Sequence, residues 1–170
     1  QNFLELTATA IFYNLSILSL DEILAIRLNG TSDILWETLE FSVSEELSRF
    51  WRIKFGVHIV PTTYKSIIHM FSHYPELWIK FYDYTKNKHD WAEYKAIRYH
   101  LTFSFDGWNN KKNVKMAGVA LSNGLNVAAA FNLKRSEKLP AFVYFMNRKL
   151  AVIDGDKTDY RPGDGHGGRI

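Results

Sequence analysis

The sequence predicts an α+β fold, in which a helical N-terminal half precedes a C-terminal antiparallel β-meander. Three observations favour this class. Apolar residues recur at three- and four-residue steps through much of the first half, which is the period of an amphipathic helix. From Tyr99 to Phe105 the period changes to the strict alternation of a half-buried strand. Further on, the dipeptide Asn123-Gly124 separates two apolar runs, which is typical of a tight type I′ hairpin.

Helical spacing and capping residues predict a series of short helices before Tyr99. Ser19 is followed three residues later by Glu22, a pattern that resembles a capping box. Asn29-Gly30 is a typical helix stop. Six of the expected helices cover residues 7–18, 20–28, 34–40, 42–55, 75–82 and 90–97. A further helix is expected to be capped by Thr62 or Thr63 and to have Ile67, Ile68 and Phe71 on its apolar side.

The strands of the second half are expected to pair with their neighbours along the chain. The Asn-Gly turn would join residues 114–121 to residues 125–133, and both runs are rich in small residues, which suggests strands pressed closely against something bulky. A second hairpin is expected from residues 141–146 and 149–153, across Asn147-Arg148. These segments complete the predicted meander.

We therefore expect three parts in the chain: a helical module over 1–56, helices with an antiparallel sheet over 57–153, and a tail rich in Gly and Asp over 154–170. The tail has almost no apolar residue and is predicted to be flexible or to lie on a partner. No run approaches the roughly 20 apolar residues needed to cross a bilayer, and no signal peptide is found. The expected location is intracellular, in the cytoplasm or nucleus, or in a virion.

Charge is unevenly distributed along the chain. The formal net charge is +3, yet residues 1–50 hold eight acids and two bases, while residues 51–170 hold nineteen bases and ten acids. Two interpretations stay open. The two regions could present surfaces to different partners, or they could simply attract each other.

The sequence offers few groups for chemistry. The absence of cysteine excludes a disulfide scaffold, thiolate metal sites and a Cys nucleophile. His69 and His73 could share a helix face, but Met70 stands where a metalloprotease has glutamate, and no third ligand is evident. The acids of the tail fail the spacing of a calcium loop, and no Gly-x-Ser-x-Gly elbow is present. We predict no catalytic residue, metal site or cofactor, which favours a non-catalytic protein over an enzyme.

The stretch from Trp78 to His100 interleaves aromatic and basic residues. Bases combined with stacking rings are what the binding of single-stranded nucleic acid requires. The candidate basic surface comprises Lys80, Lys88, Arg98, Lys111 and Lys112. The alternative is a pair of amphipathic helices whose rings form a core and whose lysines are solvated.

One resemblance to a known family lies near the N-terminus. A run rich in Leu and Ile extends from Asn14 to Leu28 and includes Asp21 and Arg27, and tryptophans follow at Trp36 and Trp51. In this order of features, residues 8–55 resemble a divergent F-box. The segment departs from the family pattern in lacking the Leu-Pro opening and in the late position of Trp51.

The resemblance implies a three-helix module that docks on a Skp1-like adaptor of a ubiquitin ligase, with the β-rich half binding the substrate. Its candidate contacts are Leu15, Leu18, Ile23, Leu24 and Ile26. Such an adaptor acts by proximity, because it raises the local concentration of a target near the ligase. These side chains could equally form the core of an α+β domain. The competing hypothesis is a structural or assembly subunit of a large particle, such as a virus, whose basic, aromatic surface contacts protein or nucleic acid.

Overall fold

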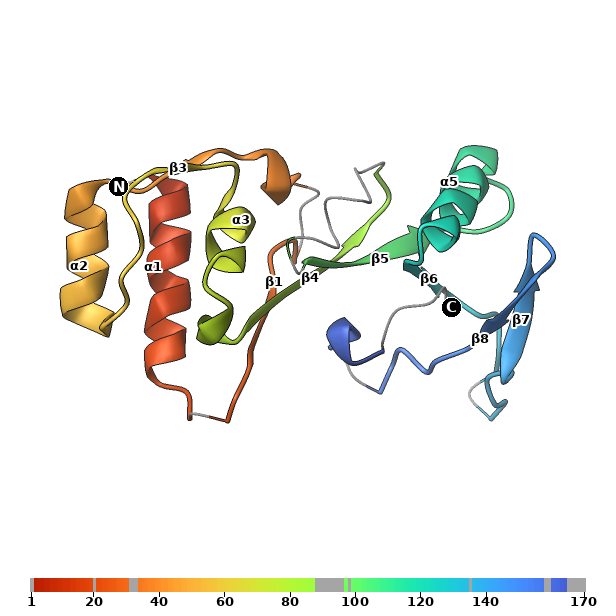
Figure 1. Cartoon of the computed structure of the whole chain (residues 1–170). Helices are drawn as coiled ribbons and strands as arrows, with labels where there is room; N and C mark the ends of the chain where they lie inside the picture. Colours follow the sequence, from red (N-terminus) through yellow and green to blue (C-terminus); the bar gives the residue numbers. More distant parts are fainter. Residues whose placement is uncertain are drawn as a thin grey trace. The chain divides into compact units, whose positions relative to one another are not determined.

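The structure is a computed structural model of the 170-residue chain, drawn in Figure 1. It describes residues 2–19, 21–30, 34–87, 97, 99–134, 136–157 and 160–164. The chain divides into two compact units, residues 1–81 and residues 82–170. Within the described residues, no helix combines the length and the apolar character that crossing a membrane requires.

Three helices build the first unit, and each begins at a polar cap whose side chain accepts a hydrogen bond from a backbone N–H of the first turn. The helices are α1 (Phe3–Ser16), α2 (Glu45–Phe55) and α3 (Ile67–Ser72). Their caps are Asn2, Ser44 and Ser66. The helices predicted over 7–18 and 42–55 are therefore confirmed, with shifted ends. The helix predicted to carry Ile67, Ile68 and Phe71 is also confirmed, but its cap is Ser66 and not Thr62 or Thr63, since Thr63 belongs to a strand.

Aromatic side chains form the core between these helices. The ring of Phe12 lies 4.8 Å from that of Trp51 and 5.2 Å from that of Phe71, measured between centroids. Trp51 is fully buried, and its Nε1 donates a hydrogen bond to Thr9 Oγ1 at 3.0 Å. The shorter elements of this unit are η1 (Trp36–Thr38), β2 (Phe41–Ser42), β3 (Thr63–Tyr64) and η2 (Pro75–Leu77), with β2 and β3 antiparallel.

A four-stranded sheet makes the fold α/β, so the predicted α+β class with an antiparallel meander is wrong. Its strands are β1 (Leu24–Arg27), β4 (Ile79–Thr85), β5 (Tyr99–Phe105) and β6 (Asn126–Ala129), in the order β1-β4-β5-β6. β5, which the alternation predicted, is confirmed. β5 and β6 pair in parallel, with Phe103 opposite Val127.

Two of the predicted helices are strands instead. In the segment 20–28, residues 24–27 form β1, where half-buried and exposed positions alternate. The period of two therefore describes these residues better than the helical spacing of their Leu and Ile side chains. In the segment 75–82, a single 3₁₀ turn ends at Leu77 and β4 begins at Ile79, because β-branched and aromatic residues favour strands. The predicted helix over 34–40 is reduced to η1, and that over 90–97 lies outside the described residues except at Ile97.

The dipeptide Asn123-Gly124 ends a helix rather than turning a hairpin. Residues 114–121, predicted as a strand, belong to α5 (Lys111–Ser122), which connects the parallel strands β5 and β6. The N–H of Leu125 donates to the carbonyl of Ala120 at 3.0 Å, and the N–H of Gly124 donates to that of Leu121 at 3.1 Å. These two bonds form a Schellman motif, which needs the positive φ of 80° found at Gly124.

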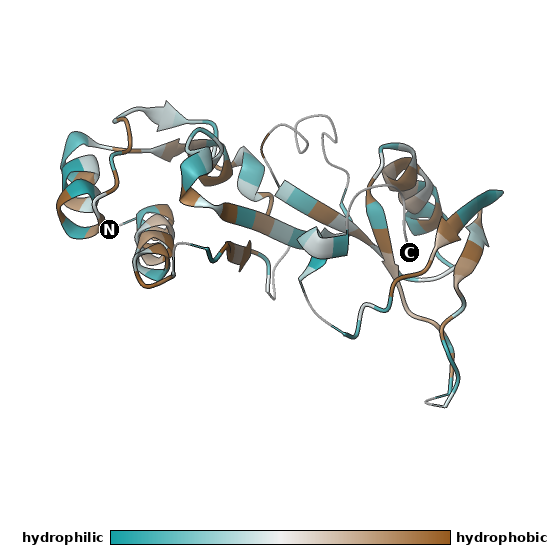
Figure 2. Cartoon of the chain, turned by 60° about the horizontal axis from the view of Figure 1, so that its bottom comes forward, coloured by the Kyte–Doolittle hydropathy of each residue, from teal (hydrophilic) through white to brown (hydrophobic). Residues whose placement is uncertain are grey.

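The predicted second hairpin is confirmed, with its turn one residue earlier. β7 (Phe142–Phe145) pairs with β8 (Arg148–Ala151) in an antiparallel ladder. Met146 and Asn147 have φ values of 47° and 63°, so both central residues of the turn take the positive φ that a type I′ turn requires. Figure 2 shows that both apolar and hydrophilic residues lie along the hairpin.

Part of the predicted flexible tail is packed. Arg161–Asp164 form the 3₁₀ turn η3, and Arg161 is buried. The Arg161 guanidinium pairs with Asp164 at 2.9 Å and donates to the carbonyl of Gly155 at 3.2 Å. A buried, paired guanidinium orders a segment that has few apolar residues, which is why composition alone failed to predict it.

Candidate nucleic-acid interface

The two strands of hairpin β7–β8 present one side to solvent and the other to the protein. Phe142 lies opposite Ala151 and Tyr144 lies opposite Lys149. Because side chains two residues apart on a strand point to the same side, these four residues share one face. We call this set, Phe142, Tyr144, Lys149 and Ala151, the hairpin face. All four residues are exposed, and the exposed fraction is 44% for Phe142 and 66% for Tyr144.

The side chains of the hairpin face contact each other in a defined way. The rings of Phe142 and Tyr144 are 5.9 Å apart between centroids and nearly perpendicular, at 88°. The ammonium of Lys149 lies 4.0 Å from the centroid of the Phe142 ring, within the range of a cation–π interaction. A positive charge is therefore held beside two exposed rings.

The opposite side of the hairpin anchors it to the second unit. Phe145 is 1% exposed, and its ring stacks on that of Trp108 at 5.0 Å and meets that of Phe105 edge-on at 5.5 Å. Leu150 is also buried. At the turn, Met146 packs on α5, where a Cβ added to Gly118 would lie 2.6 Å from its sulfur. The anchoring involves none of the residues of the hairpin face.

The loop between β5 and α5 leads directly into two of the predicted basic residues. Asn113 fixes this loop, since its Oδ1 accepts from the N–H of Asp106 at 3.0 Å and its Nδ2 donates to the carbonyl of Ser104 at 3.0 Å. Lys111 and Lys112 are exposed in the first turn of α5. Trp108, which precedes them, is 59% exposed on top of its stack with Phe145.

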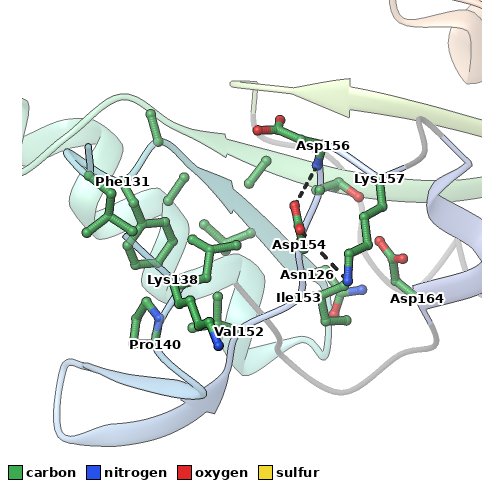
Figure 3. Close-up of a pocket in the computed structure, with 18 of the residues that line it drawn as sticks. Asn126, Phe131, Lys138, Pro140, Val152, Ile153, Asp154, Asp156, Lys157 and Asp164 are labelled. Carbon is green, nitrogen blue, oxygen red and sulfur yellow. Dashed lines mark hydrogen bonds and ion pairs between the residues drawn. The ribbon is translucent and has the colours of Figure 1, made fainter. Parts of the chain in front are cut away.

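A groove of about 1130 Å³ runs beside β6 in the same unit, and Figure 3 shows Asp154, Asp156 and Lys157 together, away from Phe131 and Pro140. The charged residues of its lining are Lys134, Glu137, Lys138, Asp154, Asp156, Lys157, Arg161 and Asp164. Positive and negative groups are equal in number there, and two of the pairs, Lys157–Asp154 and Arg161–Asp164, are ion pairs. The groove therefore has no net charge that would select a polyanion. Among the described residues, no cluster of three metal-ligating side chains occurs.

The other predicted contact residues lie in different settings. Lys80 is exposed on β4, in the first unit, whereas Lys111 and Lys112 belong to the second. Lys88 and Arg98 lie outside the described residues. The five residues predicted to bind a Skp1-like adaptor divide between α1 and its end (Leu15, Leu18) and β1 with the residue before it (Ile23, Leu24, Ile26). Their role in partner binding stays a prediction.

Among the described rings from Trp78 to His100, Trp78 is 58% exposed and Tyr84 is half-buried, while the others belong to the core. Phe81, Tyr82 and Tyr99 are buried, and the hydroxyl of Tyr99 donates to Asp83 at 2.8 Å. Among the described residues of the second unit, the exposed rings are Trp108, Phe142 and Tyr144. Sequence patterns do not single out Phe142 and Tyr144, because Phe142–Phe145 is apolar at every position, which is typical of a strand buried on both sides.

Charge separates along the boundary between the two units. Residues 1–81 hold nine acids and six bases, whereas residues 82–170 hold fifteen bases and nine acids. Between Lys138 and Ile153, around the hairpin, there are three bases and no acid. The hairpin face thus lies in the positively charged unit and in a segment that has no negative side chain.

A comparison with protein-family models finds one family that matches nearly the whole chain. The family model described as gene product 88 matches residues 2–168. The chain belongs to the gene product 88 family. Numbered gene products are a form of name given to the proteins of phage and viral genomes, and the family's description states no activity. No curated protein and no solved structure matches the chain.

Proposed function

We propose that this member of the gene product 88 family is a non-catalytic component of a phage or virus whose second unit binds nucleic acid. The single observation that supports the proposal most is the excess of bases in residues 82–170, set against the excess of acids in residues 1–81. A polyanion such as nucleic acid is attracted to a region with an excess of bases and repelled by a region with an excess of acids. The family name supports the viral setting.

The cations of the second unit are placed for contact with phosphates. Six exposed bases belong to α5 and to the hairpin with the residues before it: Lys111, Lys112, Lys115, Lys138, Arg148 and Lys149. None of the ion pairs found among the described residues involves these six. Their charges are thus not neutralised within the described structure, and each can replace a counterion on a phosphate.

The test is the salt dependence of binding, measured by fluorescence anisotropy with a labelled oligonucleotide. Wild-type affinity should fall steeply as salt rises. The double variant Lys111→Gln, Lys112→Gln should make the negative slope of log K against log [salt] shallower by about 2, since each phosphate contact contributes about one.

A matched control removes the same charge from the first unit. Arg52→Gln with Lys54→Gln also takes two exposed cations from a helix, α2, and should leave the slope unchanged. An absence of binding at low salt would contradict the proposal. Equal losses for the two double variants would contradict it as well, because net charge alone would then explain the binding.

A further inference from the structure

We propose that the hairpin face is a stacking platform for unpaired bases, so that the nucleic acid bound by the second unit is single-stranded. This inference rests on the proposed function and names its substrate class. Tyr144 would stack a base, and Lys149, held over Phe142, would contact the adjoining phosphate.

The exposure of the rings is the first support. An aromatic side chain normally buries a large apolar area in a core, yet Tyr144 is 66% exposed and Phe142 is 44% exposed. The hairpin does not need them for anchoring, because Phe145 and Leu150 on its other side are buried. Rings that are rigidly presented but leave much of their surface in solvent can take the π-face of any base.

The angle between the rings favours a single strand over a duplex. The planes of Phe142 and Tyr144 are 88° apart, so a base that is parallel to one ring is nearly perpendicular to the other. Successive bases of a duplex are stacked parallel and paired, and they cannot turn apart in this way without losing that pairing. Bases of a single strand can be splayed out and stacked separately on aromatic side chains.

Charge complementarity favours nucleic acid over a protein partner as the occupant. The segment from Lys138 to Ile153 carries Lys138, Arg148 and Lys149 and no carboxylate. Lys149 lies on the face itself, 4.0 Å from the Phe142 centroid, where a cation can bind a phosphate while the rings bind bases. Stacking rings interspersed with cations are the arrangement that binds single strands with little preference for sequence.

The experiment compares a labelled oligothymidylate of about 12 nucleotides, within the usual site size, with a duplex of equal length, both added to the full chain at low salt. Tyr144→Ala should weaken binding of the single strand by about 5- to 100-fold and leave binding of the duplex unchanged. Tyr144→Phe keeps the ring and should retain wild-type affinity. Tyr13→Ala removes a tyrosine that is 57% exposed on α1 in the first unit, and it should also have no effect.

The outcomes separate this inference from the proposed function. If Tyr144→Ala binds oligothymidylate as the wild type does, while the Lys111→Gln, Lys112→Gln variant binds it less well, the stacking platform is wrong and nucleic-acid binding stands. If Tyr144→Ala loses the same affinity for the duplex as for the single strand, the stacking platform is also wrong. If the wild type binds neither probe, both proposals fail. The circular dichroism spectrum of Tyr144→Ala should match that of the wild type, since this ring is exposed.

Discussion

Two regions of the second unit have similar sequences and different structures. The segment around Asn123-Gly124 and the segment around Met146-Asn147 each contain an apolar run that is followed by an asparagine, but the second asparagine is followed by Arg148 and Lys149. The first forms a helix, a Schellman motif and a strand parallel to β5. The second forms an antiparallel hairpin. The turn residue that looks most like a hairpin signal therefore lies where there is no hairpin.

The difference follows from side-chain size and from the number of residues with positive φ. Only Gly124 has a positive φ in the first region, whereas both Met146 and Asn147 have one in the second. The first run also contains Ala117 and Ala120, which are fully buried on one face of α5. These small side chains allow the helix to pack closely on its strands. The large rings of β7 lie on both faces of the hairpin, and the two rings on its solvent side remain exposed.

The largest expected effect is at the residue that anchors the second region, the hairpin. Phe145→Ala should lower the free energy of unfolding by about 3–5 kcal/mol, because the ring is 1% exposed and stacks on Trp108 and Phe105. Urea denaturation followed by circular dichroism measures this change. Binding of oligothymidylate should be lost with it, since the hairpin would no longer be anchored.

The same substitution on the other side of β7 is the control. Phe142→Ala removes a ring that is 44% exposed, and the loss of stability should be under about 1 kcal/mol. If Phe142→Ala destabilised the protein as much as Phe145→Ala, both faces of the hairpin would be core, and the hairpin face would not be a free surface.

Local signals in the sequence predicted those elements in which one period dominates. The alternation from Tyr99 to Phe105 gave β5, and the capped helical stripes gave α1, α2 and α3. Elements with two compatible periods were assigned wrongly. The Leu and Ile residues of β1 fit a helix as well as a strand, and the choice was made by tertiary pairing, since Leu24 N–H donates to the Trp78 carbonyl at 3.1 Å.

The binding role of the predicted basic, aromatic surface stays a prediction, and the structure locates only part of that surface. The sequence indicated a basic, aromatic surface, and Lys111 and Lys112 are exposed as that surface requires. The rings expected from Trp78 to His100 proved to be core where they are described, apart from the exposed Trp78 and the half-buried Tyr84. Which face of an entirely apolar strand is buried depends on what packs against it, and for β7 the partners are Trp108 and Phe105, far away in sequence.

The next prediction concerns the helix end that separates the two regions. Gly124→Ala should destabilise the protein by about 1 kcal/mol, because a side chain at a φ of 80° is strained. Gly118→Ala, in the same helix, should instead stabilise it by up to about 1 kcal/mol through helix propensity, since the added Cβ meets only the flexible end of Met146. Thermal unfolding of the two variants gives the two signs. A wild-type stability for Gly124→Ala would contradict the assignment of Gly124 to the left-handed cap, and a loss for Gly118→Ala would show that Met146 cannot move aside.

The smallest effect is expected at the true hairpin turn. Asn147 has a φ of 63°, and glycine adopts this conformation at lower cost, as its frequency at the second position of type I′ turns shows. Asn147→Gly should therefore stabilise the hairpin by about 0.5 kcal/mol and raise the unfolding midpoint by roughly 1–2 °C. Asn147→Pro cannot take a positive φ and should unfold the hairpin. Because the turn holds the register that places Tyr144 opposite Lys149, Asn147→Gly should keep the affinity for oligothymidylate and Asn147→Pro should abolish it. Loss of binding in Asn147→Gly, with the higher midpoint retained, would show that the nucleic acid contacts the turn rather than the face beside it.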